Sequence, residues 1–233
     1  MKSTQRYILI LAMVILLWDV SFVQPLKIFS SYIHQIGHFI MALAFSYGVD
    51  DFSIRITGES YNIINPKGIL SQFMVANAGY LGSMLFAFCV FYLKNTDVKK
   101  YVLGSVALVF VGITIAYSDA GEKTTYAMLF VAIVLFIYMI QSEKIKDWAI
   151  DIVGISSIVF AIIDTAVNSI FYEINTEFQI FTNVLVEQPY TDTLHLQDIS
   201  GIPSLLWGLL WLTGSIIGVY LFFVRLSDKE KVS

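Results

Sequence analysis

The chain has 233 residues and a formal net charge of −4, and 57% of its residues are hydrophobic while only 14% are charged. Soluble domains carry about 25% charged residues, so this composition argues against an ordinary water-soluble globule. The negative net charge gives no basic face for a nucleic acid partner, and a single cysteine excludes a disulfide scaffold. We therefore expect an all-α polytopic membrane protein, with residues 1–233 forming a single integral membrane domain.

Apolar segments follow one another along the whole chain, each close to the roughly 20 residues that a helix needs to cross the bilayer. This pattern predicts six or seven transmembrane helices. Four tryptophans, Trp18, Trp148, Trp207 and Trp211, fall near segment ends, and we interpret them as anchors at the water–lipid interface. The segments cover residues 7–24, 27–48, 68–93, 101–117, 123–140, 148–172 and 203–225.

Two connections between these segments are long enough to have structure of their own. Residues 50–67 alternate apolar Phe52, Ile54 and Ile56 with polar residues before Gly58, which predicts a short membrane-associated β-hairpin. Residues 173–202 form an acidic loop without lysine or arginine, and its apolar centre indicates an interfacial helix.

The second segment contains two of the three histidines, His34 and His38, four residues apart. At this spacing both side chains lie on one face of a helix, close enough to share one metal ion. Counted from Lys27 at 1.5 Å per residue, they lie about 10 Å and 16 Å into the membrane. Polar residues at that depth are costly and usually functional, so we expect a metal site here rather than hydrogen bonds between helices alone.

The run His34-Gln35-Ile36-Gly37-His38 is the zincin pattern H-E-x-x-H with glutamine in place of glutamate. With glycine before the second histidine, it resembles the HExGH helix of the site-2 protease family of intramembrane zinc metallopeptidases, in its compact bacterial branch. Three later landmarks are similar to elements of that branch and stand in the same order. They are Ala78-Gly79-Tyr80-Leu81-Gly82, then Thr191-Asp192-Thr193, then Ser200-Gly201-Ile202-Pro203 with Trp207-Gly208.

The resemblance implies a Zn²⁺ cofactor held by His34, His38 and an aspartate from a distant helix. Asp192 matches the aspartate motif and is the preferred third ligand. Asp164, deep in an apolar helix, is the alternative; if Asp192 binds zinc, Asp164 with Asn168 could orient a histidine. His195 could also approach the metal, but a loop histidine is more often solvated. The core would consist of residues 27–93 and 148–225, in a multi-pass protein of the bacterial cytoplasmic membrane.

Gln35 is the departure from the family pattern, because the glutamate at this position is the general base. An amide keeps the size and much of the hydrogen bonding of glutamate but cannot accept the proton. Zinc could still bind, while hydrolysis should fall by roughly 100- to 10,000-fold. Two origins fit, a substitution introduced to trap an intact protein or a natural relative that no longer cleaves, and the otherwise complete residue set favours the first.

These observations predict a zinc-dependent intramembrane metalloendopeptidase, impaired by Gln35, that acts on transmembrane segments of other proteins. Asn77 is a candidate for holding the substrate backbone. One alternative is a non-catalytic pseudoprotease that binds transmembrane segments, and another is an ion or proton pathway through His34, His38 and Asp164. Gly214 and Gly218 form a G-x-x-x-G motif that could support self-association, although packing within one bundle is the simpler interpretation.

Membrane orientation is predicted differently by two criteria. Lysine and arginine are more numerous in the loops on the side of the carboxyl terminus, which places that terminus in the cytoplasm and residues 50–67 outside. The family resemblance implies the opposite, with the hairpin on the cytoplasmic side.

Overall fold

The computed structural model describes residues 3–53, 61–117, 122–180 and 191–232. Each of the seven predicted apolar segments contains a helix, and the helix ends differ from the predicted ends by up to nine residues, most at the end of α6, where helical structure continues as a π-helical segment. The helices are α1 (Ser3–Leu16), α2 (Gln24–Phe45), α3 (Ile69–Leu93), α4 (Lys99–Tyr117), α5 (Glu122–Ile140), α6 (Glu143–Ile163) and α9 (Ser204–Val232). A single 3₁₀ turn, η1 (Ser21–Val23), leads into α2.

Shorter helical elements follow α6. A π-helical segment, η2 (Asp164–Phe171), continues α6 directly and runs into α7 (Tyr172–Phe178). α8 (Asp192–Ser200) stands in the second half of the predicted acidic loop, and the middle of that loop, including Glu187, lies outside the described residues. Gly201 ends α8 with φ +72°, a left-handed conformation that glycine adopts without steric cost.

Within the described residues, four helical stretches are long and apolar enough to cross a membrane. They are Ser21–Phe45, Ile69–Leu93, Glu143–Thr176 and Ser204–Leu221. This supports an integral membrane protein with an all-helical fold, while six or seven crossings stay a prediction.

Two strands follow α2 and pair in antiparallel fashion. β1 (Ser46–Ser53) lies beside β2 (Tyr61–Pro66), with Val49 opposite Ile64 and Ser53 opposite Tyr61. β1 starts four residues before the predicted hairpin, because α2 passes into extended backbone at Ser46. Residues 54–60, which include the predicted turn at Gly58, lie outside the described residues, and membrane association of the strands stays a prediction.

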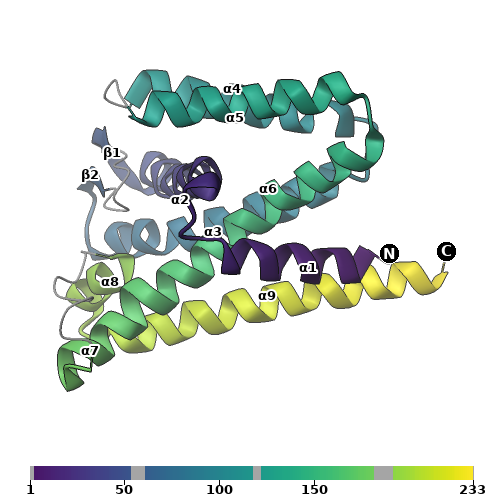
Figure 1. Cartoon of the computed structure of the whole chain (residues 1–233). Helices are drawn as coiled ribbons and strands as arrows, with labels where there is room; N and C mark the ends of the chain where they lie inside the picture. Colours follow the sequence, from purple (N-terminus) through teal and green to yellow (C-terminus); the bar gives the residue numbers. More distant parts are fainter. Residues whose placement is uncertain (1–2, 54–60, 118–121, 181–190, 233) are drawn as a thin grey trace.

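The helices surround α2, the helix that contains both histidines. α4 and α5 lie side by side along one edge of the molecule, α1 and α9 run along the opposite edge, and α2 lies between them (Figure 1). Aromatic rings join α2 to the α4–α5 pair: Phe29 stacks on Phe130 with ring centroids 5.4 Å apart and meets Phe110 edge-on at 5.4 Å. α3 and α6 pack against α2 from the other sides.

A buried carboxylate ties three helices together at the end where α6 begins. Asp151 of α6 is fully buried and binds Lys94 at the end of α3, with 2.6 Å between Oδ1 and Nζ. Its Oδ2 lies 2.9 Å from an Arg6 nitrogen of α1. Because burying a charge is costly unless it is paired, this cluster fixes the relative positions of α1, α3 and α6.

One glycine of the G-x-x-x-G motif of α9, Gly218, packs against another helix of the same chain. A β-carbon at Gly218 would overlap the end of the Met84 side chain of α3, whereas a β-carbon at Gly214 would meet nothing within 4 Å. Gly218 therefore allows α9 to approach α3, and self-association through this motif stays a prediction.

Candidate metal centre

α2 places His34 and His38 one turn apart and both buried, with 3.2 Å between their Nε2 atoms. The other ring nitrogen of His38, Nδ1, lies 2.7 Å from the Val75 carbonyl oxygen of α3 and donates to it. This leaves Nε2 of His38 unprotonated when the imidazole is neutral, which is the form that binds a metal. In the described part of the chain Nδ1 of His34 has no hydrogen-bond partner, so its ring is held by packing against Tyr80 and Phe160.

α8 supplies the carboxylate that meets the two histidines. Asp192 Oδ2 lies 2.9 Å from Nε2 of His34 and 3.0 Å from Nε2 of His38. Asp192 is the first residue of α8, where Thr191 caps the helix by accepting from the Leu194 amide. The Thr193 hydroxyl donates to Ser169 of η2 at 2.7 Å, which fixes the start of α8 against the π-helical segment.

Glycines on α2 and α3 create the space for this arrangement. A β-carbon at Gly79 would overlap Nε2 of both His34 and His38, and one at Gly37 would overlap the Ala78 carbonyl oxygen. A β-carbon at Gly82 would come within 2.8 Å of the Gly37 α-carbon. Gly79 and Gly82 therefore allow α3 to lie against the histidine helix, and Gly37 has the same role from the other side.

The three converging atoms suit a small divalent ion. Nε2 of His34, Nε2 of His38 and a carboxylate oxygen of Asp192 lie within 4.8 Å of one another. Tetrahedral zinc with bonds of 2.0–2.1 Å separates its ligand atoms by about 3.3 Å, close to the spacing found here. Burial alone would raise the pKa of Asp192, but the adjacent His38 and His34 rings outweigh it and hold the pKa well below its usual range.

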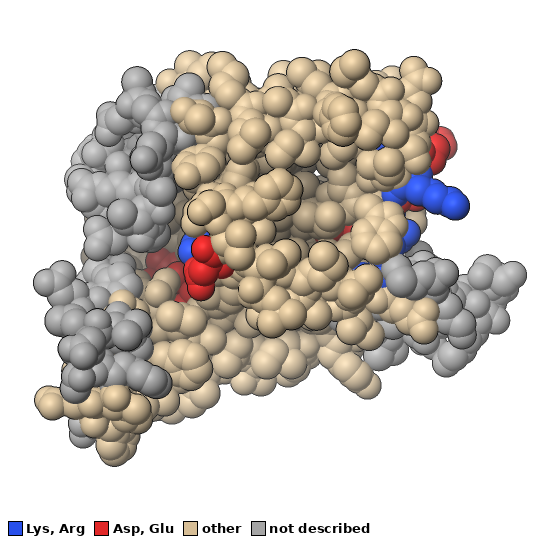
Figure 2. Space-filling model, in the orientation of Figure 1, with Lys and Arg blue, Asp and Glu red and all other residues tan. Residues whose placement is uncertain are grey.

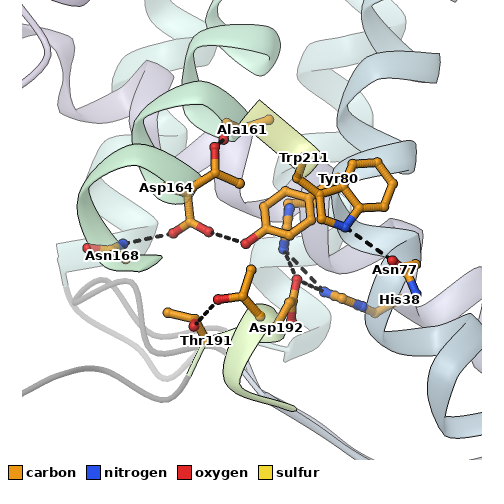
Figure 3. Close-up of polar contacts among 12 residues, drawn as sticks. His38, Asn77, Tyr80, Ala161, Asp164, Asn168, Thr191, Asp192 and Trp211 are labelled. Atoms are coloured by element: carbon orange, nitrogen blue, oxygen red, sulfur yellow. Dashed lines mark hydrogen bonds and ion pairs between the residues drawn. The ribbon is translucent and has the colours of Figure 1, made fainter. Parts of the chain in front are cut away.

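Asp164, the alternative ligand, lies outside this group. Its Oδ2 accepts a hydrogen bond from the Tyr80 hydroxyl at 2.9 Å, and its Oδ1 accepts from Asn168 at 2.8 Å (Figure 3). The Tyr80 ring in turn packs edge-on against His34, with centroids 5.0 Å apart. Asp164 and Asn168 are thus connected to His34 through Tyr80, and their role in orienting the histidine stays a prediction. His195 is also outside the group, one turn beyond Asp192 on α8.

Trp211 belongs to the surroundings of the site, which the sequence did not indicate. Its indole N–H donates to the Asn77 side-chain oxygen at 3.1 Å, and its ring lies 5.3 Å from the Tyr80 ring (Figure 3). The interpretation of Trp211 as an interfacial anchor is therefore wrong, because its position near the start of α9 faces α3 rather than the lipid headgroups. Asn77 donates to the Phe73 carbonyl oxygen as well, so both ends of its amide are engaged within the protein.

Gln35 is buried between the two histidines along α2. The structure thus places an amide, without a basic atom, inside the part of the helix that holds the candidate ligands.

Comparison with known proteins identifies the family of the chain. A model of the Peptidase M50B-like family matches residues 7–222. The chain therefore belongs to this family of proteases, which is part of the site-2 protease family, and the resemblance seen in the sequence is confirmed. No curated protein and no solved structure matches the chain.

Proposed function

We propose that this protein is a zinc-dependent intramembrane metalloendopeptidase of the site-2 protease type, acting on transmembrane segments of other proteins, and that Gln35 impairs its hydrolytic step. The observation that carries the proposal is the convergence of His34, His38 and Asp192 from two distant parts of the chain. Membership of a protease family and four apolar helices support the same conclusion.

His34, His38 and Asp192 would hold Zn²⁺, which leaves the fourth position of a tetrahedral site open, as in catalytic zinc sites. When bound, zinc supplies a Lewis acid that polarises a carbonyl and activates water. The chain keeps its ligands in place by the His38–Val75 hydrogen bond and by the Tyr80 ring beside His34. Gly79 keeps the space next to both Nε2 atoms free of side chain.

The substrate of such a site would be a membrane-embedded segment that has unwound locally. A helix keeps its carbonyl groups in hydrogen bonds, so a protease must open the helix before attack. β1 follows α2 directly, and a two-stranded sheet leaves one edge of each strand available for pairing. Pairing of an unwound substrate with this sheet would hold its backbone extended near α2. Asn77 is a less suitable substrate contact than its sequence position suggested, because Trp211 and Phe73 already engage its amide.

The role of position 35 can be tested by restoring the carboxylate. Gln35→Glu should raise the rate of cleavage of a model transmembrane substrate by roughly 100- to 10,000-fold, the usual contribution of proton transfer. The matched control is Gln35→Glu combined with His38→Ala, which restores the base but removes a ligand and should stay inactive. If zinc is bound and Gln35→Glu cleaves no faster than the unaltered protein, the proposed role of this residue is overturned.

A second candidate function is a pseudoprotease that binds transmembrane segments without cutting them. The observation that favours it is Gln35 itself, buried within an otherwise complete set of ligands. This function predicts that the native gene encodes glutamine at position 35, and that the unaltered protein captures a transmembrane peptide with zinc present. Transport of ions or protons, the other alternative, would survive removal of the metal by a chelator.

A further inference from the structure

An apolar groove lies between α3 and α4, at the part of α2 that precedes the metal ligands. Its volume is about 250 Å³, and its walls include Phe86, Cys89 and Leu93 of α3 and Tyr101 and Val102 of α4. Phe29 of α2 also lines it, five residues or about 7.5 Å along the helix before His34. The groove is therefore separate from the candidate metal centre but shares its helix.

The groove opens to the outside of the helix bundle. Cys89 is exposed, and Tyr101 is 60% exposed. The neighbouring side chains Leu85 and Tyr92 of α3 are exposed as well. α3 is long and apolar enough to span a membrane, so its apolar exterior at the groove is suited to face lipid.

One uncompensated positive charge stands at the end of the groove. Lys94 is paired with Asp151 at 2.6 Å and Lys99 with Asp147 at 2.6 Å. Lys100 forms no ion pair with the residues that the structure describes, and its Nζ lies 4.9 Å from the centre of the Tyr101 ring, which lines the groove. Figure 2 shows lysine and arginine side chains, with acidic side chains beside them, at the end of the molecule where α6 begins.

We propose that this groove is a binding site for a phospholipid with an anionic headgroup, with one acyl chain between α3 and α4 and the phosphate at Lys100. If the groove were empty, the side chains of both its walls would lose packing contacts, and an acyl chain restores them. A transmembrane helix, about 10 Å across with its side chains, is too wide for a cavity of this volume. Because Lys94 and Lys99 are already paired with aspartates, Lys100 carries the electrostatic preference for an anionic over a zwitterionic headgroup.

Cys89 provides a reporter inside the groove, because it is the only cysteine of the chain. Delipidated protein is mixed with equal amounts of phosphatidylglycerol and phosphatidylcholine, and the retained lipid is identified by native mass spectrometry. In parallel, the rate of Cys89 alkylation by N-ethylmaleimide is measured in detergent with either lipid. We expect several-fold preferential retention of phosphatidylglycerol, together with several-fold slower alkylation when that lipid is present.

Lys100→Gln should abolish both the preference and the protection. Lys144→Gln is the matched control, because Lys144 is an exposed lysine at the start of α6 that does not line the groove. It should behave like the unaltered protein. Equal retention of the two lipids, retention without protection of Cys89, or an equal effect of the two lysine variants would overturn the proposal. None of these readouts depends on zinc or on proteolysis, so the result is independent of the proposed function.

Discussion

Gly79 of α3 lies directly against the Nε2 atom of His34, so closely that a β-carbon at this position would overlap that atom. The same β-carbon would overlap Nε2 of His38. The candidate metal centre therefore depends on a residue that would contribute no ligand, because only glycine leaves the Nε2 atoms of His34 and His38 accessible.

Replacement of Gly79 by alanine should abolish zinc binding. The added methyl group would meet the two Nε2 atoms and push the rings apart or occupy the metal position. Metal analysis of purified Gly79→Ala protein measures this directly. Gly214→Ala is the matched control, since a β-carbon there meets nothing within 4 Å. Normal zinc content in the Gly79 variant would show that the arrangement of α2 and α3 is different.

Replacement of Gly37 by alanine should destabilise the packing of α2 on α3. Its β-carbon would meet the backbone carbonyl of Ala78, which cannot rotate away as a flexible side chain could. Alanine in an open helical position is about 1 kcal/mol more favourable than glycine, so Gly112→Ala, where nothing lies within 4 Å, should be neutral or stabilising. Thermal unfolding in detergent compares the two variants, and equal melting temperatures would contradict this assignment.

Replacement of Asp151 by asparagine should cost about 3–5 kcal/mol of stability, because it leaves Lys94 and Arg6 without their carboxylate. Unfolding by denaturant in mixed micelles measures the difference. Asp147→Asn removes a partly exposed partner of Lys99 at the same end of the molecule and should have a much smaller effect. Similar losses in both variants would mean that the buried cluster does not tie α1, α3 and α6 together.

The two aspartates near the site should respond differently to substitution. Asp192→Ala removes a ligand and should eliminate tight zinc binding. Asp164→Asn leaves the three ligands in place but weakens the support of Tyr80, and should lower zinc affinity by about 10- to 100-fold, as is typical for residues that position ligands. Competition with a fluorescent zinc chelator separates the two cases. If Asp164→Asn eliminates binding while Asp192→Ala retains it, the assignment of the third ligand must be reversed.

The helices and the histidine pair could be predicted because both follow from short-range patterns. Apolar runs of 19 to 25 residues indicate helices whatever their partners. His34 and His38 share a face because of the helical period alone. The turn at Gly58 is not described, and the number of membrane crossings depends on helix tilt and surroundings that the apolar runs do not specify.

The rest of the site depends on tertiary contacts. Asp192 lies 158 positions from His34, so no local pattern connects them, and only the resemblance to a known family indicated the pairing. The bonds of Asp164 to Tyr80 and of Trp211 to Asn77 join separate helices in the same way. Tyr80 could have been noticed from its place beside Gly79 in the glycine-rich motif, whereas nothing in the sequence distinguished Trp211 from an interfacial tryptophan.

Zinc content of the purified protein tests the central claim most directly. Protein with intact ligands should contain about one zinc ion per chain after dialysis against a weak chelator, and His38→Ala protein should contain almost none. A chain that folds normally but binds no zinc, or one that keeps its zinc after loss of His38, would contradict the account.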